Sequence, residues 1–400
     1  MVLISTYCKR RIPLPHLDER LCRNLKTEKQ VTSNQQQLFV KYTMKSLYLF
    51  FFIFLSLISC NQQPKQIVRN EKYQVNQVID TSDVTNNFYD NVETFQLPVK
   101  ELFIDGEIAN PGKVDFTCLP LHSVIVKETL LDSAGGDRFT GAYRYDGYSL
   151  FDILDRRILK KANIAEFKAI IDLYIEVENE KGEKTVFSWG EIYYPNNLHN
   201  ILIASGVSRI VPSKTKELWP LPVDSRIVAA CDLVTERNIS SPVKITVKSY
   251  SHSFSVKQGM SPMYCSQMDV FSSSKMVREI ETLPSDLTNV TFNTIFYGRG
   301  KGIHSTTPFN GILLKDLLIK DYPVTRVNLK SGIVCIAGKD GYRSVVSYSE
   351  LFNRNDQQEF MLVKTKTMED GGLFRIFAAS DFFSDRAIKS VSEIYLDINK

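Results

Sequence analysis

A glycine-rich stretch, Tyr297–His304, carries the residues of this chain that are best suited to bind a small anion. Its glycines stand at every second position, and Arg299, Lys301 and His304 add positive charge. Backbone N–H groups that converge in such a turn form a concave site for phosphate, sulfate or carboxylate. The spacing differs from that of a nucleotide-binding P-loop. We therefore predict that these three side chains bind a small anion, with an ordinary solvated loop as the alternative.

Other side chains that could bind metals or act as nucleophiles form no recognisable motif. The stretch 260–268 contains three methionines and Cys265, which could bind copper(I), but we interpret it as packing between two domains. His122, His199 and His252 are far apart in the sequence, and we interpret them as surface residues. The mature chain contains no C-x-x-C, no H-E-x-x-H and no G-x-S-x-G. We therefore predict no catalytic residues and no metal ligands.

A repeated block determines how the chain must be organised. Residues 226–232 read Arg-Ile-Val-Ala-Ala-Cys-Asp, and residues 375–381 read Arg-Ile-Phe-Ala-Ala-Ser-Asp. Internal repetition predicts a duplicated structural unit, and we expect two domains, 97–250 and 251–400. The arginine and the aspartate that bound each block could line a site. Because both copies keep them, we interpret them as ion pairs that stabilise the fold.

The elements of each domain follow from local patterns. Alternation of apolar and polar residues at 171–177 predicts a half-buried strand, and the spacing of Leu150, Leu154 and Ile158 predicts a helix. Both copies contain an S-x-x-E segment, which is typical of a capped helix start, so we interpret these serines and glutamates as structural. We expect an α/β fold (α+β mixed sheets with short helices) in two tandem domains.

An export signal precedes these domains. Residues 44–59 begin with Met44-Lys45 and continue into an apolar run, rich in phenylalanine, that is too short to span a membrane comfortably. The run ends in Leu-Ile-Ser before Cys60, which resembles the lipobox of bacterial lipoproteins. This resemblance implies cleavage before Cys60, lipidation of its thiol, and a location in the bacterial cell envelope. The protein would be anchored to a membrane by lipid and would face the periplasm or the cell surface.

The net charge of the chain is different when residues 1–59 are left out of the count. The net charge of +4 includes nine basic and three acidic residues within 1–59, which leaves 40 basic and 42 acidic residues. This balance excludes a basic nucleic-acid-binding surface as a dominant feature. The polar residues 1–43 would extend the signal unusually, so we interpret Met44 as the true start. Residues 60–96, rich in Asn and Gln, are predicted to be a flexible tether.

The order of elements resembles the molybdopterin-binding domain of the sulfite oxidase family. Four segments carry the resemblance: the strand and turn Phe103–Gly112, the helix Tyr148–Leu154 with its counterpart Ile312–Leu318, the Lys339–Tyr342 hairpin, and the Arg-Ile-x-Ala-Ala strand. It implies two tandem sulfite-oxidase-like domains. It also implies that the Tyr297–His304 loop lies close to Asp340 and Tyr342, which we add to the predicted anion site.

The sequence departs from this family at the position of its molybdenum-binding cysteine. Neither Lys127–Leu131 nor Asn293–Tyr297 contains a cysteine, and molybdenum there needs a thiolate ligand. We therefore expect no cofactor, and a non-catalytic component that binds an envelope protein partner or a small anionic ligand. The alternatives are a molybdopterin-dependent oxidoreductase with atypical ligands and a small-anion receptor.

Overall fold

A computed structural model of the chain describes residues 93–397, except 213, 258, 262 and 365–373. These residues all belong to one compact unit, Ile79–Lys400. The predicted signal, Cys60 and most of the predicted tether lie outside the described residues. Among the described helices, none is both long and apolar enough to cross a membrane.

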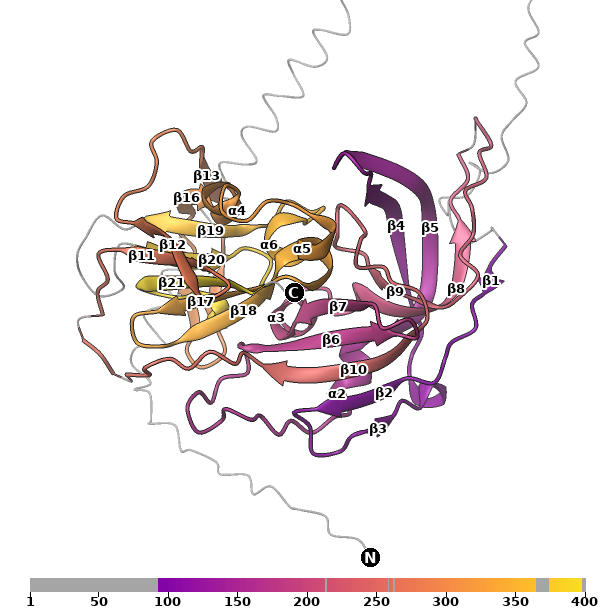
Figure 1. The fold of residues 1–400 in the computed structure, drawn as a ribbon, viewed down its shortest axis with the longest axis horizontal. Coiled ribbons are helices and arrows are strands. Elements are labelled where there is room, and N and C mark those ends of the chain that lie inside the picture. The colour runs from indigo at the N-terminus through magenta and orange to yellow at the C-terminus, as the bar shows by residue number, and fades with distance from the viewer. Residues whose placement is uncertain (1–92, 213, 258, 262, 365–373, 398–400) are drawn as a thin grey trace, which may run out of the picture. The chain divides into compact units, whose positions relative to one another are not determined.

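Two five-stranded sheets are formed by the first half of the described chain (Figure 1). In the first sheet the order is β1-β8-β5-β4, with β9 on β8: β1 (Phe95–Gln96), β8 (Ile201–Arg209), β5 (Asp137–Ser149), β4 (His122–Leu131) and β9 (Arg226–Ala229). The second sheet consists, in order, of β3 (Gly112–Lys113), β2 (Phe103–Gly106), β10 (Pro242–Ser249), β6 (Leu173–Asn179) and β7 (Lys184–Ser188).

The second half forms two more large sheets and a hairpin. The third sheet consists, in order, of β12 (Lys275–Ile280), β11 (Met268–Ser272), β21 (Val391–Asp397), β17 (Ile333–Gly338) and β18 (Arg343–Ser347). The fourth consists of β13 (Asn289–Phe292), β16 (Phe309–Leu313), β19 (Phe360–Lys364) and β20 (Phe374–Ala378). The hairpin pairs β14 (Phe296–Gly298) with β15 (Gly302–Ser305).

The strand pairings of the first two sheets recur in the third and fourth. β2 runs parallel to β10, which is antiparallel to β6, and β6 is antiparallel to β7. In the same way β11 runs parallel to β21, which is antiparallel to β17, and β17 is antiparallel to β18. The chain of antiparallel pairs β4-β5-β8-β9 likewise corresponds to β13-β16-β19-β20. Sequence repetition and topological repetition therefore coincide.

The described helices are short. They are α2 (Leu150–Asp155), α3 (Trp189–Tyr193), α4 (Leu314–Leu318), α5 (Arg326–Ser331) and α6 (Tyr348–Phe352), with the 3₁₀ turns η2 (Phe116–Cys118) and η3 (Ser384–Arg386). A complete capping box starts α3: Ser188 accepts from the backbone of Glu191, and Glu191 accepts from the backbone of Ser188. Helices of one half contact strands of the other: α3 of the first half packs on β18, and α5 of the second half packs on β7.

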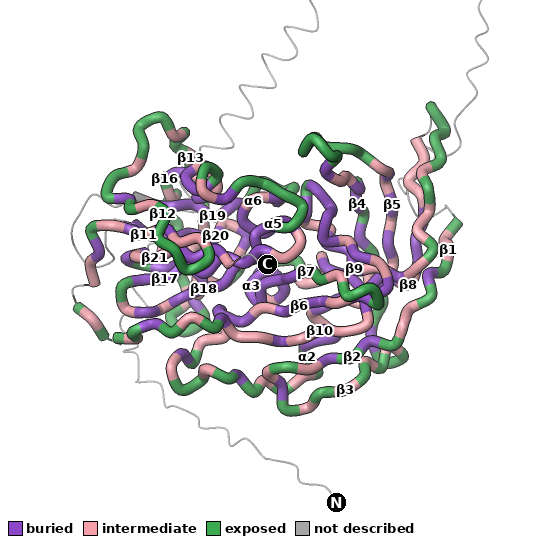
Figure 2. The backbone as a smooth tube through the Cα atoms, in the orientation of Figure 1, coloured by how far each residue is buried: buried purple, intermediate pink, exposed green. Residues whose placement is uncertain are grey.

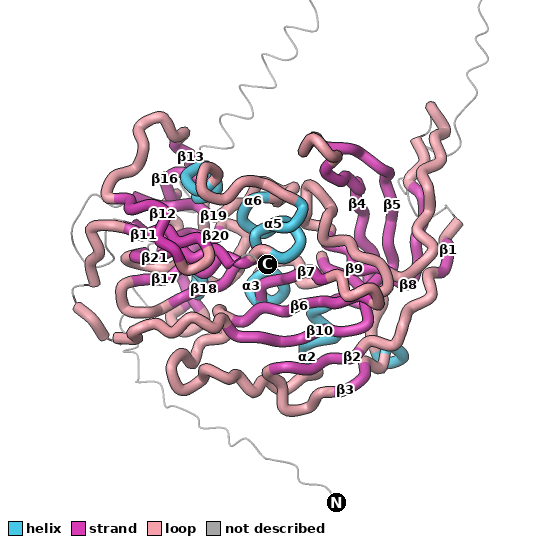
Figure 3. The backbone as a smooth tube through the Cα atoms, in the orientation of Figure 1, coloured by secondary structure: helices cyan, strands magenta, loops and turns pink. Residues whose placement is uncertain are grey.

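The predicted fold class is wrong. The described part of the chain is mostly β, with 43% strand and 11% helix, and its four large sheets form an arrangement similar to a four-bladed propeller. It is therefore neither α/β nor two tandem sulfite-oxidase-like domains. Figure 3 shows the few helical turns among many strands. The pattern that includes Ile158 predicts too long a helix, since α2 ends at Asp155. The thirteen-residue strand β5 begins at Asp137, directly after two glycines that are typical of a loop.

Buried apolar side chains form several clusters rather than one core. Figure 2 shows buried residues along the strands of both halves. The two largest each belong mainly to one half of the chain. A smaller cluster joins the halves, because Val186 of β7 packs with Cys335 and Val345 of β17 and β18. Backbone groups also cross between halves, as where the Val345 N–H donates to the Ile171 carbonyl at 2.9 Å. The repeats therefore share buried surface.

Candidate functional site

Three side chains with metal-binding groups, His122, Asp152 and His199, converge at one end of the first sheet. His122 begins β4 and is paired with Gly147 of β5. β5 ends at Ser149, which caps α2, so Asp152 lies in the first turn of that helix. His199 comes just before β8, which pairs with the same end of β5. The registers of β4, β5 and β8 thus bring together residues that are distant in the sequence.

The carboxylate atom Oδ2 of Asp152 is central to this cluster. It lies 2.7 Å from Nε2 of His122 and 3.6 Å from Nδ1 of His199. The two imidazole rings stack, with centroids 3.7 Å apart and planes 9° apart. Ser149 Oγ donates to Asp152 Oδ2 at 2.7 Å and lies 3.0 Å from His199 Nδ1. The three side chains are 23%, 17% and 34% exposed, so solvent reaches the cluster.

Electrostatics favour a neutral ring at one of these positions. Burial, together with the neighbouring His122, lowers the pKa of His199, although Asp152 opposes the shift. A neutral imidazole presents one nitrogen lone pair, which is the form that binds metals. Two imidazole nitrogens and one carboxylate oxygen are a ligand set that suits Zn²⁺. The same contacts also connect the start of β4, the start of α2 and the segment before β8.

The three histidines, interpreted from the sequence as surface residues, are all partly exposed, but two of them meet in space. His122 and His199 are partly buried and touch each other. The ring of His252 contacts those of Phe254 and Tyr395, and the expectation that the histidines are not ligands stays a prediction. No spacing rule could have paired the first two, since their meeting depends on strand register.

The predicted anion-binding residues lie on and beside the β14–β15 hairpin. Arg299 and Lys301 are in its turn, and His304 is in β15. The Nε atom of Arg299 is 2.5 Å from Oδ2 of Asp385, whereas Lys301 and His304 are exposed. A carboxylate this close to Arg299 reduces the positive potential that an anion would meet.

The other two predicted anion-site residues differ in position. The hydroxyl of Tyr342 donates to the backbone oxygen of Asp385 at 2.7 Å, and burial raises the pKa of Tyr342 to about 12. Asp340 lies in the turn between β17 and β18, where its Oδ1 accepts from the Tyr342 N–H at 3.0 Å. The structure thus brings Arg299 and Tyr342 to Asp385, and Asp340 stabilises a turn. The anion site stays a prediction.

The repeated blocks contribute to a buried network of charges. Two fully buried arginines each pair with an aspartate and a glutamate: Arg237 with Asp232 and Glu191, and Arg386 with Asp381 and Glu350. The predicted role in stabilising the fold fits this burial, but one predicted partner is wrong. Arg226 pairs with Glu128 at 2.7 Å instead of Asp232. The partner of Asp232 is the arginine five residues further on.

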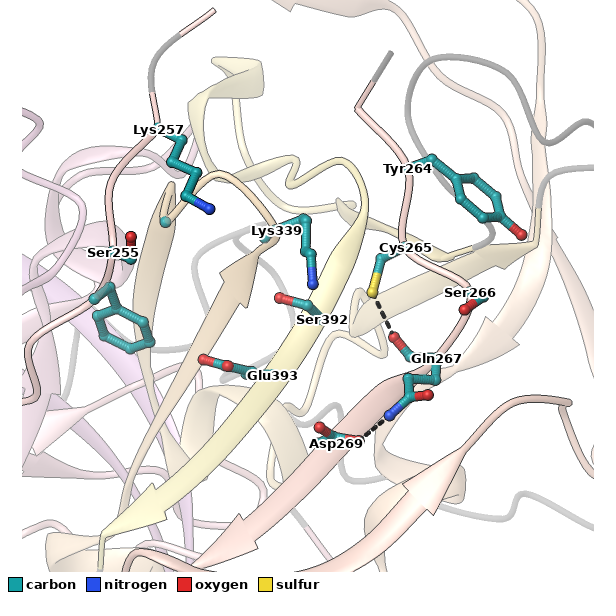
Figure 4. Close-up of a pocket in the computed structure, with 13 residues that line it drawn as sticks. Ser255, Lys257, Tyr264, Cys265, Ser266, Gln267, Asp269, Lys339, Ser392 and Glu393 are labelled. Carbon is teal, nitrogen blue, oxygen red and sulfur yellow. Dashed lines mark hydrogen bonds between the residues drawn. The ribbon is translucent and has the colours of Figure 1, made fainter. Parts of the chain in front are cut away.

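A cavity of about 500 Å³ lies between the segment that follows β10 and the turn between β17 and β18 (Figure 4). Two ammonium groups line it, those of Lys257 and Lys339, and so do two carboxylates, those of Asp269 and Glu393. Within the described part of the chain, neither lysine forms an ion pair. The cavity therefore presents two positive and two negative charges that do not neutralise one another in direct pairs.

Neutral groups complete the lining of this cavity. Gln267 donates to Asp269 at 3.2 Å, and the thiol of Cys265 donates to the backbone oxygen of Gln267 at 2.8 Å. The four described cysteines are all free thiols. Met268, from the same sulfur-rich stretch, is fully buried, which fits the interpretation of this stretch as packing. The cavity is thus polar, with donors and acceptors on its walls.

A second cavity, of about 520 Å³, lies beside Lys127 and Thr129, where the resemblance places a molybdopterin. Its walls are mainly apolar, and its lining residues include one cation, Lys127, and one carboxylate, Asp232, but no cysteine. The nearby Cys231 does not supply a thiolate either, because burial raises the pKa of its thiol. These residues do not fit a group that needs a thiolate on molybdenum and cations on its phosphate.

Comparison with known proteins does not assign this chain to a family. No protein-family model matches it, and no curated protein is significantly similar to it. The candidate sites are therefore interpreted from their own geometry and chemistry.

Proposed function

We propose that this protein is a lipid-anchored, non-catalytic component of a bacterial cell envelope that binds a small zwitterionic solute. The cavity of Figure 4 carries this proposal, since two ammonium groups and two carboxylates line one space. A solute that bears both an ammonium and a carboxylate, such as an amino acid or a dipeptide, would complement both kinds of group.

The size of the cavity supports a small solute. Binding sites for small molecules usually enclose about 300–1,000 Å³, and this cavity has about 500 Å³. Its balanced charge favours a zwitterion over a simple anion, because Asp269 and Glu393 would repel an anion. Polar groups on the wall, including Ser392 and Gln267, could fix the orientation of the solute by hydrogen bonds.

The proposed location in the cell envelope rests on the sequence that precedes the described residues. The segment 44–59 and Cys60 have the pattern of a lipoprotein signal. Expression in a bacterial host followed by membrane fractionation tests this part. Wild-type protein should sediment with membranes and carry lipid on Cys60 by mass spectrometry, whereas Cys60→Ala should remain unprocessed and without lipid. Absence of lipid on Cys60 in the wild type would contradict the anchor.

Calorimetric titration of the purified protein with a panel of amino acids and dipeptides tests the solute site. We expect at least one zwitterion to bind, and Lys339→Met and Glu393→Gln each to weaken its affinity about tenfold or more, because each removes one charged contact. Esters and N-acetyl derivatives of the same solute should bind more weakly than the zwitterion itself.

Lys275→Met is the matched control, because Lys275 is an exposed lysine of the same half outside the cavity lining. Its affinity should equal that of the wild type. The proposal is wrong if no zwitterion in the panel binds, or if the cavity variants bind as tightly as this control.

A further inference from the structure

We propose that His122, Asp152 and His199 form a binding site for a divalent transition-metal ion, with Zn²⁺ as the ion that best suits their ligand atoms. None of the three lines the cavity of Figure 4, so the metal site does not depend on the solute proposed for that cavity. Its support is the convergence of three ligand atoms that all lie within 4.8 Å of one another.

The distances are close to those of a coordination sphere. Zinc binds imidazole nitrogen and carboxylate oxygen at about 2.0–2.2 Å, so ligand atoms of a tetrahedral site lie about 3.3 Å apart. Asp152 Oδ2 is 2.7 Å from His122 Nε2 and 3.6 Å from His199 Nδ1. An ion would replace the proton in the shorter contact, and the two atoms would separate by about 0.6 Å. Because the lone pair of an imidazole nitrogen lies in the ring plane, binding would also turn the two rings out of their nearly parallel stack.

Neighbouring groups already orient the ligand atoms. Ser149 Oγ donates to Asp152 Oδ2 and accepts from the Asp152 N–H at 3.1 Å, which fixes the carboxylate at the start of α2. The ring of Phe151 meets that of His199 edge to face, with centroids 5.8 Å apart. Support of this kind around the ligands is typical of metal sites. The neutral tautomers with protons on His122 Nδ1 and His199 Nε2 would leave both ligand nitrogens free.

The second copy of the repeat shows that the fold does not require these histidines. In the second copy Val290 takes the place of His122, because it pairs with Gly311 as His122 pairs with Gly147, and Leu313 corresponds to Ser149. The equivalent helix α4 still forms there, although Leu313 makes no side-chain capping bond. Asp316 keeps the position of Asp152 in its first turn. A purely structural reason for the two stacked histidines is therefore weak, whereas a ligand role explains why two imidazoles face one carboxylate.

Three protein ligands with partial exposure leave a coordination position open to solvent. Zinc sites with three protein ligands usually hold a water or an exchangeable ligand in the fourth position. Bound metal would also join the start of β4, the start of α2 and the segment before β8. Since only the folded chain assembles these ligands, binding should stabilise it by linkage.

Titration of tag-free protein, first treated with a chelator, measures the site directly. Zn²⁺ should bind with a 1:1 stoichiometry, and Co²⁺ should bind in its place and give a visible absorption spectrum typical of nitrogen and oxygen ligands in low coordination number. His122→Gln and His199→Gln should each weaken the affinity for Zn²⁺ by a factor of about ten to a hundred. Zn²⁺ should also raise the melting temperature of the wild type.

His252→Gln is the matched control, because His252 contacts aromatic rings and lies outside the cluster. It should bind Zn²⁺ as the wild type does. Circular dichroism checks that each variant is folded, and the Co²⁺ spectrum of the wild type gives a test that needs no variant. Unchanged affinity in both cluster variants, or a Co²⁺ spectrum that indicates only water ligands, would overturn the proposal.

Discussion

Arg237 is fully buried and donates to Asp232, to Glu191 and to Ser347 of the other repeat. A buried ion pair gives little net stability, because loss of hydration offsets the attraction of its charges. Removal of one partner is costly, because it leaves the other charge buried and uncompensated. We therefore expect Arg237→Met to lower the free energy of unfolding by about 3–5 kcal/mol, measured by urea denaturation.

An exposed ion pair provides the control for this prediction. Nζ of Lys113 lies 2.6 Å from Oε2 of Glu101, and both side chains are 65% exposed. Such pairs contribute at most about 1 kcal/mol, since water screens them. Lys113→Met should therefore change the free energy of unfolding by about 1 kcal/mol or less. Similar losses in both variants would contradict the assignment of the buried network as a structural support.

At the level of elements, the start of α3 connects the two repeats. Ser188 Oγ accepts from the Glu191 N–H at 2.9 Å and donates to Glu350 Oε2 at 2.7 Å. Loss of an N-cap costs about 1 kcal/mol, and a buried carboxylate left without a donor adds about 1–3 kcal/mol. We expect Ser188→Ala to lower the free energy of unfolding by about 2–4 kcal/mol. Thermal and urea unfolding followed by circular dichroism would measure this loss.

The cap of α2 is the comparison for that of α3. Ser149 accepts from the Asp152 N–H, and its hydroxyl donates to a carboxylate on its own helix that is partly exposed. Water can replace that donor, so Ser149→Ala should cost only about 1 kcal/mol. A loss for Ser188→Ala no greater than for Ser149→Ala would show that its bond to Glu350 adds nothing to stability.

These elements also show which features the sequence can predict. The S-x-x-E segment of Ser188 spans one helical turn, so its capping box is visible in four residues and is confirmed. The partner of Asp232 could not be assigned from the sequence, because Arg226 precedes it by six residues and Arg237 follows it by five. The contact between His122 and His199 depends on the register of three strands. Register is set by long-range packing and leaves no local pattern.

For the whole molecule, repetition was visible in the sequence but the fold class was not. Matched blocks in the two halves indicate duplication, and the strand pairings do recur. The expected α/β class failed because short apolar runs do not distinguish a buried strand from a helix turn. The strand β5 illustrates this, since its glycines and charged residues resemble a loop, although Tyr143 and Tyr145 are buried in it.

The shared interior of the repeats predicts how the molecule unfolds. Val186 of the first half packs with Val345 of the second, and Arg237 reaches across to Ser347. If either half opened alone, the other would expose this apolar surface and leave buried polar groups without partners. Residues 97–250 and 251–400 should therefore unfold in one cooperative transition, unlike two independent domains. Hydrogen exchange with mass spectrometry in increasing urea measures each half separately.

Peptides from both halves should lose their slowest-exchanging amides at the same urea concentration. Arg237→Met makes this test sharper, because the substitution lies in the first half only. In a cooperative unit the substitution should lower the urea midpoint equally for peptides of the first half (β6 and β10) and of the second half (β17 and β21). The reason is that β17 and β18 lose a packing partner when β7 opens. If the midpoint fell only for peptides of the first half, the two repeats would be separate folding units. The buried network would then be a contact between domains rather than part of one interior.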